Sequence, residues 1–145
     1  MIAVDTNILV YAHRREAPLH ASALAAIASL ADHPAAWGIP WPCLHEFYST
    51  VTSNKVRPPT SMAIAWEAIH RLADLPNLRM LGEGADHIDR LHRIANAGRI
   101  VGGAIHDARI AAICLAHGVT ELWTADRDFS RFPQLKTRNP LSMSP

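Results

Sequence analysis

Short apolar runs alternate along this chain with longer segments in which apolar residues recur every three or four positions. The run at residues 2–4 has no polar alternation, which suits a strand buried on both faces of a parallel sheet. Further short runs at 36–39, 78–81 and 122–124 predict three more strands, and the longer segments have the period of amphipathic helices. Strands that alternate with helices indicate an α/β fold, a three-layer α/β/α sandwich around a short parallel sheet.

Proline and glycine mark the limits of the predicted helices. These helices cover residues 19–30, a segment around Glu46, 61–75, 85–97 and 104–118. Pro42 suits a first helical position, Pro58 and Pro59 break the chain, and Gly118 suits the end of the last helix. The Asp-Thr-Asn sequence at residues 5–7 is able to cap one more helix directly after the first strand.

Composition is consistent with an ordinary globular protein. The 145 residues are 49% hydrophobic, enough to form a core, and we expect a single domain over residues 1–145. Asp5 and the basic cluster at 13–15 interrupt any signal-peptide pattern, and no apolar stretch is long enough to cross a bilayer, so we expect a cytoplasmic protein without membrane contact. Cys43 and Cys114 lack metal-ligand spacing and are expected to be reduced core thiols.

The net charge of +1 argues against a protein that coats polyanions through bulk positive charge. Most of the basic residues are Arg, whose planar guanidinium binds phosphate in two places. Six basic residues fall near the expected site loops: Arg14, Arg15, Lys55, Arg57, Arg127 and Arg131. For most of them the better explanation is compositional, an Ala- and Arg-rich chain of the kind that a GC-rich genome encodes.

Four acidic residues lie in separate places that an α/β fold can bring together: Asp5, Glu46, Asp107 and Asp126. Carboxylates gathered in one pocket repel each other and resist ionisation, so several converging acids usually indicate a hard cation. Asp5 follows the first strand, at the sheet edge where ligands of open α/β sheets bind. Its alternative role is only to cap the following helix.

Asp107 shares its helical face with Ile110, Ala111 and Cys114, which are expected to be buried. A carboxylate on a buried stripe needs a partner or a metal, although a first-turn Asp can also reach solvent and complement the helix dipole. Glu46 alone carries little information, because surface helices contain many Glu residues.

Asp126 follows a strand-like run at 121–125 and repeats the opening arrangement of a strand followed by Asp. Asp128 is either a second ligand or the cap of a short helix that begins near Phe129. We favour Asp126 as the metal ligand of this pair.

These segments resemble the PIN-domain ribonucleases, most closely the VapC-type toxins of bacterial toxin–antitoxin pairs. The matching segments are residues 4–10, Glu46, 106–112, 124–129, 132–135 and 139–141, in this order over nearly the whole chain. The resemblance implies a Mg²⁺- or Mn²⁺-dependent endoribonuclease that hydrolyses RNA, the toxin of a type II system. It further implies a homodimer and a small cognate VapB-like antitoxin whose C-terminal segment blocks the site.

In the mechanism that we predict, Asp5, Asp107 and Asp126 hold the ion directly or through water, because oxygen ligands suit hard cations. Glu46 orients a water molecule. The ion activates water for in-line attack on the scissile phosphorus, which leaves 5′-phosphate and 3′-hydroxyl ends. The apolar stripes of residues 61–75 and 85–97 predict that these helices contribute to a symmetric dimer.

Two other classes of function stay open from the sequence. A haloacid-dehalogenase-like phosphotransfer enzyme also has Asp after its first strand, but it normally has a second Asp two residues later, where this chain has Asn7. A catalytically inactive PIN-like binding module would act through protein contacts alone, and the four intact acids argue against it.

Aromatic residues and histidines give weaker signals. His45 and His106 each adjoin an acid, so on a helix each points about 100° away from it, and no HxH or HExxH pattern suggests a histidine metal site. Tryptophans are able to stack on bases, but apolar surroundings favour core packing for all four. They are Trp37, Trp41, Trp66 and Trp123.

Overall fold

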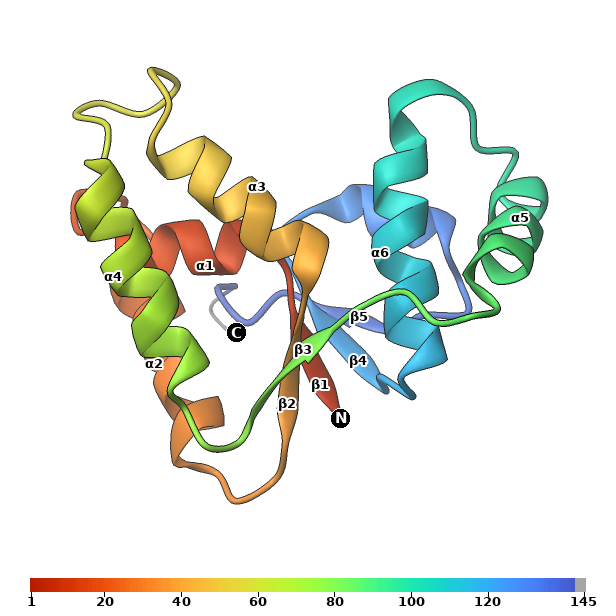
Figure 1. The fold of residues 1–145 in the computed structure, drawn as a ribbon, viewed down its shortest axis with the longest axis horizontal. Coiled ribbons are helices and arrows are strands. Elements are labelled where there is room, and N and C mark those ends of the chain that lie inside the picture. Colours follow the sequence, from red (N-terminus) through yellow and green to blue (C-terminus); the bar gives the residue numbers. More distant parts are fainter. Residues whose placement is uncertain (143–145) are drawn as a thin grey trace.

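Five parallel strands form one sheet at the centre of the molecule (Figure 1). The computed structural model describes residues 1–142. Its strands are β1 (Ile2–Val4), β2 (Trp37–Pro40), β3 (Leu78–Leu81), β4 (Glu121–Trp123) and β5 (Thr137–Arg138), in the spatial order β3-β2-β1-β4-β5. Strands β1 to β4 match the predicted runs to within one residue. The sequence pattern does not predict β5, because its two exposed polar residues carry no apolar signal.

Helices connect these strands. They are α1 (Thr6–His13), α2 (His20–Asp32), α3 (Trp41–Val51), α4 (Met62–Ala73), α5 (His87–Ala97) and α6 (Ile105–Ala116), with the short 3₁₀ helices η1 (Gly102–Ala104) and η2 (Arg127–Arg131). The four long predicted helices match α2, α4, α5 and α6 to within two residues. Asp5 caps α1. Gly118 follows α6 with a φ of 69°, a conformation that glycine adopts without strain.

Helices cover both faces of the sheet. Figure 1 shows α1 to α4 on one side and α5 with α6 on the other, which confirms the predicted three-layer sandwich. The central strand β1 is flanked by β2 and β4, and its Ala3 and Val4 are fully buried, which explains the absence of polar alternation. The Asp5 N–H donates to the Trp123 carbonyl at 3.0 Å, so the carboxyl ends of β1 and β4 stay side by side.

The core packing expected for all four tryptophans holds only for Trp37 and Trp123, which are buried. Trp41 and Trp66 leave 43% and 48% of their surface exposed, so the prediction is wrong for these two. Both belong to helices, where an apolar neighbour in sequence points in a different direction and does not place the ring in the core.

Cys43 and Cys114 are buried free thiols, as predicted. Burial raises the pKa of Cys114 to about 12 and raises that of Cys43 well above its usual value, so both thiols stay protonated at neutral pH. Within residues 1–142, none of the helices has the length and apolar character needed to span a membrane.

Candidate active site

The four predicted acids line one pocket at the carboxyl edge of the sheet, which we call the acidic pocket. It has a volume of about 240 Å³, and its lining includes Asp5, Glu46, Asp107 and Asp126 together with Thr6 and Asn7. Four elements supply the acids, since Asp5 follows β1, Glu46 lies in α3, Asp107 lies in α6 and Asp126 follows β4. Figure 1 shows α3 and α6 on either side of the strand ends from which these segments leave.

Hydrogen bonds hold Asp5 at the base of the acidic pocket, with only 4% of its surface exposed. Its Oδ1 accepts from the Thr6 N–H at 2.8 Å and from the Cys43 thiol at 3.4 Å. Its Oδ2 accepts from the Thr124 hydroxyl at 2.7 Å and from the Asn7 amide at 3.2 Å. Burial nevertheless raises the pKa of Asp5, because these hydrogen bonds offset only part of the lost hydration.

Asn7 and Thr124 join the two strand ends that carry acids. The Asn7 carbonyl oxygen accepts from the Ala125 N–H at 3.0 Å, and the Thr124 hydroxyl oxygen accepts from the Asp126 N–H at 3.0 Å. These bonds fix the loop with Asp126 relative to Asp5. In the sequence, Asn7 and Thr124 are each a polar residue two positions from an Asp that follows a strand. The sequence pattern alone does not mark such a neighbour as part of a site.

Glu46 is positioned from a neighbouring helix. Its Oε2 accepts from the hydroxyl of the buried Thr6 at 2.9 Å, while the rest of the Glu46 side chain is exposed. Thr6 was not singled out by sequence, because its role depends on a contact between α1 and α3. The contact directs the Glu46 carboxylate toward the acidic pocket.

Asp107 lies on a face of α6 whose other members, Ile110, Ala111 and Cys114, are all buried, as predicted. Asp107 itself is half-buried. Burial is the largest cause that raises its pKa. Further causes are the nearby carboxylates of Asp126, Asp5, Asp128 and Glu46, in decreasing order. Because every one of these influences opposes ionisation, a cation in the pocket would stabilise Asp107.

Asp107, Asp126 and Asp128 offer carboxylate oxygens that all lie within 4.8 Å of one another. Asp5 lines the same pocket but does not belong to this trio. Asp126 also caps η2, because its Oδ1 accepts from the Asp128 N–H at 2.8 Å. The alternative in which Asp128 caps a helix near Phe129 is therefore wrong, since the helix begins earlier and Asp126 is its cap.

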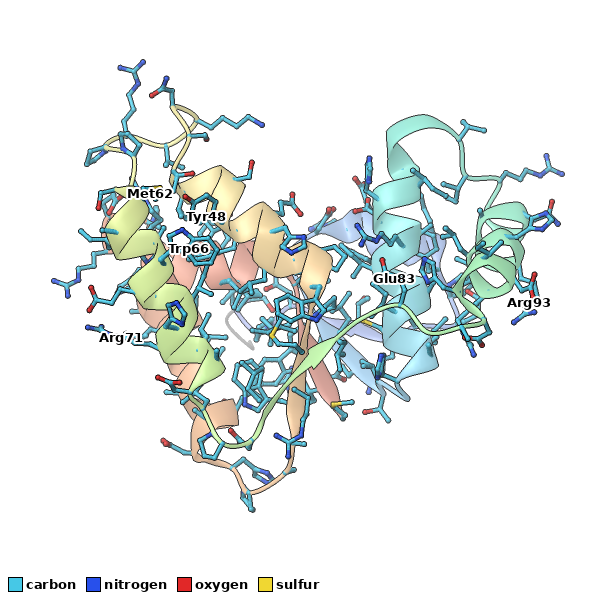
Figure 2. All side chains as sticks on the ribbon, viewed as in Figure 1. Tyr48, Met62, Trp66, Arg71, Glu83 and Arg93 are labelled. Atoms are coloured by element: carbon cyan, nitrogen blue, oxygen red, sulfur yellow. The ribbon has the colours of Figure 1, made fainter. Side chains whose placement is uncertain are left out.

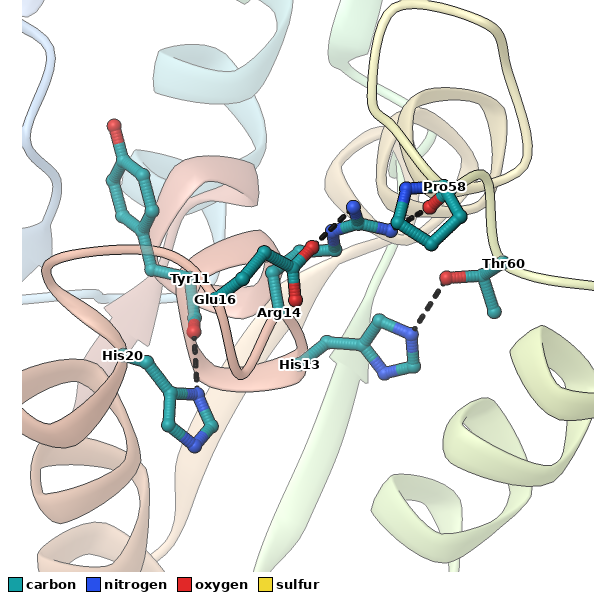
Figure 3. A network of polar contacts seen from close by, with 7 residues as sticks. All are labelled: Tyr11, His13, Arg14, Glu16, His20, Pro58 and Thr60. Atoms are coloured by element: carbon teal, nitrogen blue, oxygen red, sulfur yellow. Dashed lines mark hydrogen bonds and ion pairs between the residues drawn. The ribbon is translucent and has the colours of Figure 1, made fainter.

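Arg14, one of the basic residues near the expected site loops, makes contacts away from the acidic pocket (Figure 3). Its side chain is largely buried, donates to the Pro58 carbonyl at 2.6 Å and forms an ion pair with Glu16. These contacts tie the end of α1 to the loop before α4. Arg14 therefore has a structural role, in agreement with the view that most arginines are not phosphate ligands.

Comparison with known proteins identifies the family. The PIN domain model matches residues 2–135. A VapC ribonuclease of Mycobacterium bovis is 37% identical over 142 residues, which cover 97% of this chain and 96% of that protein. Ribonuclease VapC48 of Mycobacterium tuberculosis is 27% identical over 139 residues, covering 95% and 96%. The chain therefore belongs to the PIN-domain family and, within it, to the VapC ribonucleases.

Solved structures share this fold. A chain in the VapBC2 complex of Rickettsia felis, bound to a DNA fragment from its promoter, has a TM-score of 0.69 and 22% identity, covering 96% of this chain and 98% of that chain. VapC20 of Mycobacterium tuberculosis, described as a Sarcin-Ricin loop cleaving toxin, has a TM-score of 0.68 and 19% identity, covering 90% and 93%. The family assignment argues against the haloacid-dehalogenase alternative.

Proposed function

We propose that this protein is a Mg²⁺- or Mn²⁺-dependent endoribonuclease and the toxin of a type II toxin–antitoxin pair. The observation that carries the proposal is the acidic pocket, where Asp5, Glu46, Asp107 and Asp126 meet in a chain of the VapC ribonuclease family. An oxygen-only donor set of this kind suits chemistry on phosphates.

A hard divalent cation fits these donors. The close carboxylate oxygens of Asp107, Asp126 and Asp128 and the raised pKa of Asp107 both support a bound cation. We assign Asp5, Asp107 and Asp126 to the ion, directly or through water. A bound ion would supply an activated water molecule and neutralise charge on the phosphate.

The protein's own groups orient the reaction. The Thr6 hydroxyl donates to Glu46 and orients it, so that the Glu46 carboxylate can accept a hydrogen bond from the attacking water. Thr124 and Asn7 donate hydrogen bonds to the Asp5 carboxylate and hold it at the base of the pocket. The water oxygen bonds to phosphorus as the bond from phosphorus to the 3′ oxygen breaks, which leaves a 5′-phosphate and a 3′-hydroxyl.

Cleavage of RNA by wild type and Asp107→Asn tests the proposal. Wild type should cleave with Mg²⁺ or Mn²⁺ and not with EDTA. The variant keeps the shape of the side chain but loses its charge, and we expect a loss of at least about 100-fold in rate, as for other groups that act directly on the reacting centre. Asp89→Asn, at an exposed position on α5, is the matched control and should retain full activity. Circular dichroism establishes that each variant folds. Full activity in folded Asp107→Asn, or cleavage in EDTA, would contradict the mechanism.

A small antitoxin is the protein partner that we propose. The solved structures of similar fold include a toxin–antitoxin complex from Klebsiella pneumoniae, with a TM-score of 0.62 and 21% identity. A ribonuclease without restraint would harm its own cell, so an inhibitor produced together with it is expected. Cellular RNA as the substrate would place the activity in the cytoplasm, and that location stays a prediction.

A homodimer is the second assembly that we propose. The outer helix α4 exposes Met62, Ile64 and Trp66 by 68%, 54% and 48%, and Ile88 of α5 is 81% exposed. Figure 2 shows Met62 and Trp66 along α4, with Tyr48 of the neighbouring α3 beside Trp66. Apolar side chains of this size gathered on one helix are favourable to bury against a second copy.

A further inference from the structure

A second hollow adjoins the acidic pocket and shares two of its acids. This α3–α6 hollow has a volume of about 460 Å³ and is lined by His45 and Glu46 of α3 and by His106, Asp107 and Arg109 of α6. Glu46 and Asp107 also line the acidic pocket. A molecule whose phosphate lies among the acids can therefore extend directly into the α3–α6 hollow.

The His45 ring borders the hollow on the α3 side, and the Trp41 ring lies next to His45 without lining the hollow. His45 lies one helical turn after Trp41, and their ring centroids are 6.1 Å apart with planes inclined by 34°. His45 is exposed, and Trp41 is the exposed tryptophan whose core packing was wrongly expected. The Trp41 ring rests against Gly82, where an added Cβ would lie 3.4 Å from Cδ1 of the indole. The Trp41 ring is thus supported by the segment that follows β3, and the His45 ring beside it is open toward solvent.

The opposite wall carries cationic and ring groups from α6. His106 is exposed, and Arg109 is half-buried and forms an ion pair with Glu83. Figure 2 shows Glu83 beside α6, near the start of the segment that follows β3. Because this pair fixes the guanidinium, Arg109 is presented at the hollow in a defined orientation, with a planar surface and several N–H donors.

We propose that the α3–α6 hollow binds one nucleobase next to the scissile phosphate. The base stacks on His45, whose ring is backed by Trp41, and Arg109 with His106 faces the base from α6. Stacking on aromatic side chains suits every base, and a volume of 460 Å³ lies within the range of about 300–1,000 Å³ typical of small-molecule sites. The acids of the neighbouring pocket are assigned to the cation and not to the base. The hollow therefore positions the RNA, and the inference rests on the proposed ribonuclease function.

The test combines His45 variants with RNA that lacks one base. Single-stranded oligonucleotides carry one abasic site at each position around the cleaved bond in turn. For intact RNA, His45→Ala should raise KM about tenfold with little change in kcat, because stacking acts on bound substrate before and during the reaction. His45→Phe keeps a ring and should restore KM. When the abasic site is at the position whose base the hollow binds, the KM of wild type should rise by the same factor. The KM of His45→Ala should not rise further on this RNA.

A matched control and a second readout separate this inference from the proposed function. His92→Ala removes an exposed histidine of α5 that lines neither pocket, and should behave as wild type. Binding of the same oligonucleotides is measured by fluorescence anisotropy on Asp107→Asn, with and without His45→Ala. If wild type cleaves no RNA, the proposed function fails, and these binding data still decide the inference. Equal KM and equal binding with and without His45→Ala, or an equal loss at every abasic position, would overturn it.

Discussion

At the scale of single residues, Asp5 and Asp107 are both acids whose ionised form burial disfavours, but their surroundings differ. Both are removed from water, and burial raises the pKa of each. Asp5 accepts hydrogen bonds from Thr124 and Thr6, which offset part of the cost. For Asp107 the other influences are like charges, all of which oppose ionisation. A cation in the pocket would therefore stabilise ionised Asp107.

Metal ions should stabilise the wild-type protein through Asp107. We expect Mn²⁺ or Mg²⁺ at about 100 times its dissociation constant to stabilise the fold by about 2.7 kcal/mol, which raises the melting temperature by several degrees. Asp107→Asn should lose most of this effect, and Asp5→Asn should weaken it. Thermal melts monitored by circular dichroism in EDTA and in each ion measure the shift. Identical melting curves for the wild type in all three buffers would contradict the binding of a metal ion.

His13 should make stability sensitive to mild acid. Its Nε2 lies 3.0 Å from the Thr60 hydroxyl, and burial, followed by the charge of Arg14, lowers its pKa (Figure 3). Because the folded state favours neutral His13, its contribution is fully present above the unfolded pKa of about 6.5 and is lost as pH falls through the lower folded value.

The melting temperature should therefore fall between pH 7.5 and pH 5, by a few degrees at most because the ring is partly hydrated. His13→Gln should flatten this part of the profile, while His92→Gln, at an exposed position, should follow wild type. Parallel profiles for His13→Gln and wild type would show that another group titrates.

At the scale of elements, the turn from β4 into η2 decides how Asp126 and Asp128 divide their roles. Asp126 caps η2 and lines the acidic pocket, whereas Asp128 is exposed two residues further on. An Asn can still cap a helix, so Asp126→Asn removes charge without removing the cap. The two positions can thus be compared without loss of the helix.

Asp128→Asn should retain more ribonuclease activity than Asp126→Asn. The reason is that Asp126 lines the pocket with Asp5 and Asp107, whereas Asp128 is exposed and does not line it, although its carboxylate lies near those of Asp107 and Asp126. Initial rates of RNA cleavage with Mn²⁺, on variants with equal circular dichroism spectra, give the comparison. An inactive Asp128→Asn beside an active Asp126→Asn would reverse the assignment.

At the scale of the whole molecule, α4 carries several exposed apolar residues that the fold leaves uncovered. The fold buries only one side of this helix, where Ala65 and Ile69 lie, and α3 packs against it. Met62 and Trp66 remain outside. A surface of this kind favours association.

Light scattering should give a mass near twice 15.9 kDa at tens of micromolar. The double substitution Met62→Glu and Trp66→Glu places charges on this surface and should shift the protein toward monomer while leaving its circular dichroism spectrum unchanged. Arg71→Glu, an exposed substitution on the same helix, is the control for added negative charge. A monomer mass for the wild type would contradict the dimer.

The sequence by itself determined most of the elements and their order along the chain. Residues 2–4 predict the central strand because burial on both faces requires an unbroken apolar run, and Gly118 predicts the end of α6 because glycine adopts a positive φ without strain. The acids were found because each has a local context: Asp5 and Asp126 follow strands, and Asp107 shares a buried face. These signals depend only on neighbours within a few residues.

The tertiary structure alone decided the contacts across elements. The hydrogen bonds of Thr6 to Glu46 and of Thr124 to Asp5 join residues 40 and 119 positions apart. The exposure of Trp41 was decided in the same way, because a ring on a helix is buried only if another element packs over it. The periodicity of the sequence shows which residues share a face of a helix. Which other element packs against that face is decided only by the tertiary structure. For that reason the acidic pocket was anticipated from sequence, and the α3–α6 hollow beside it was not.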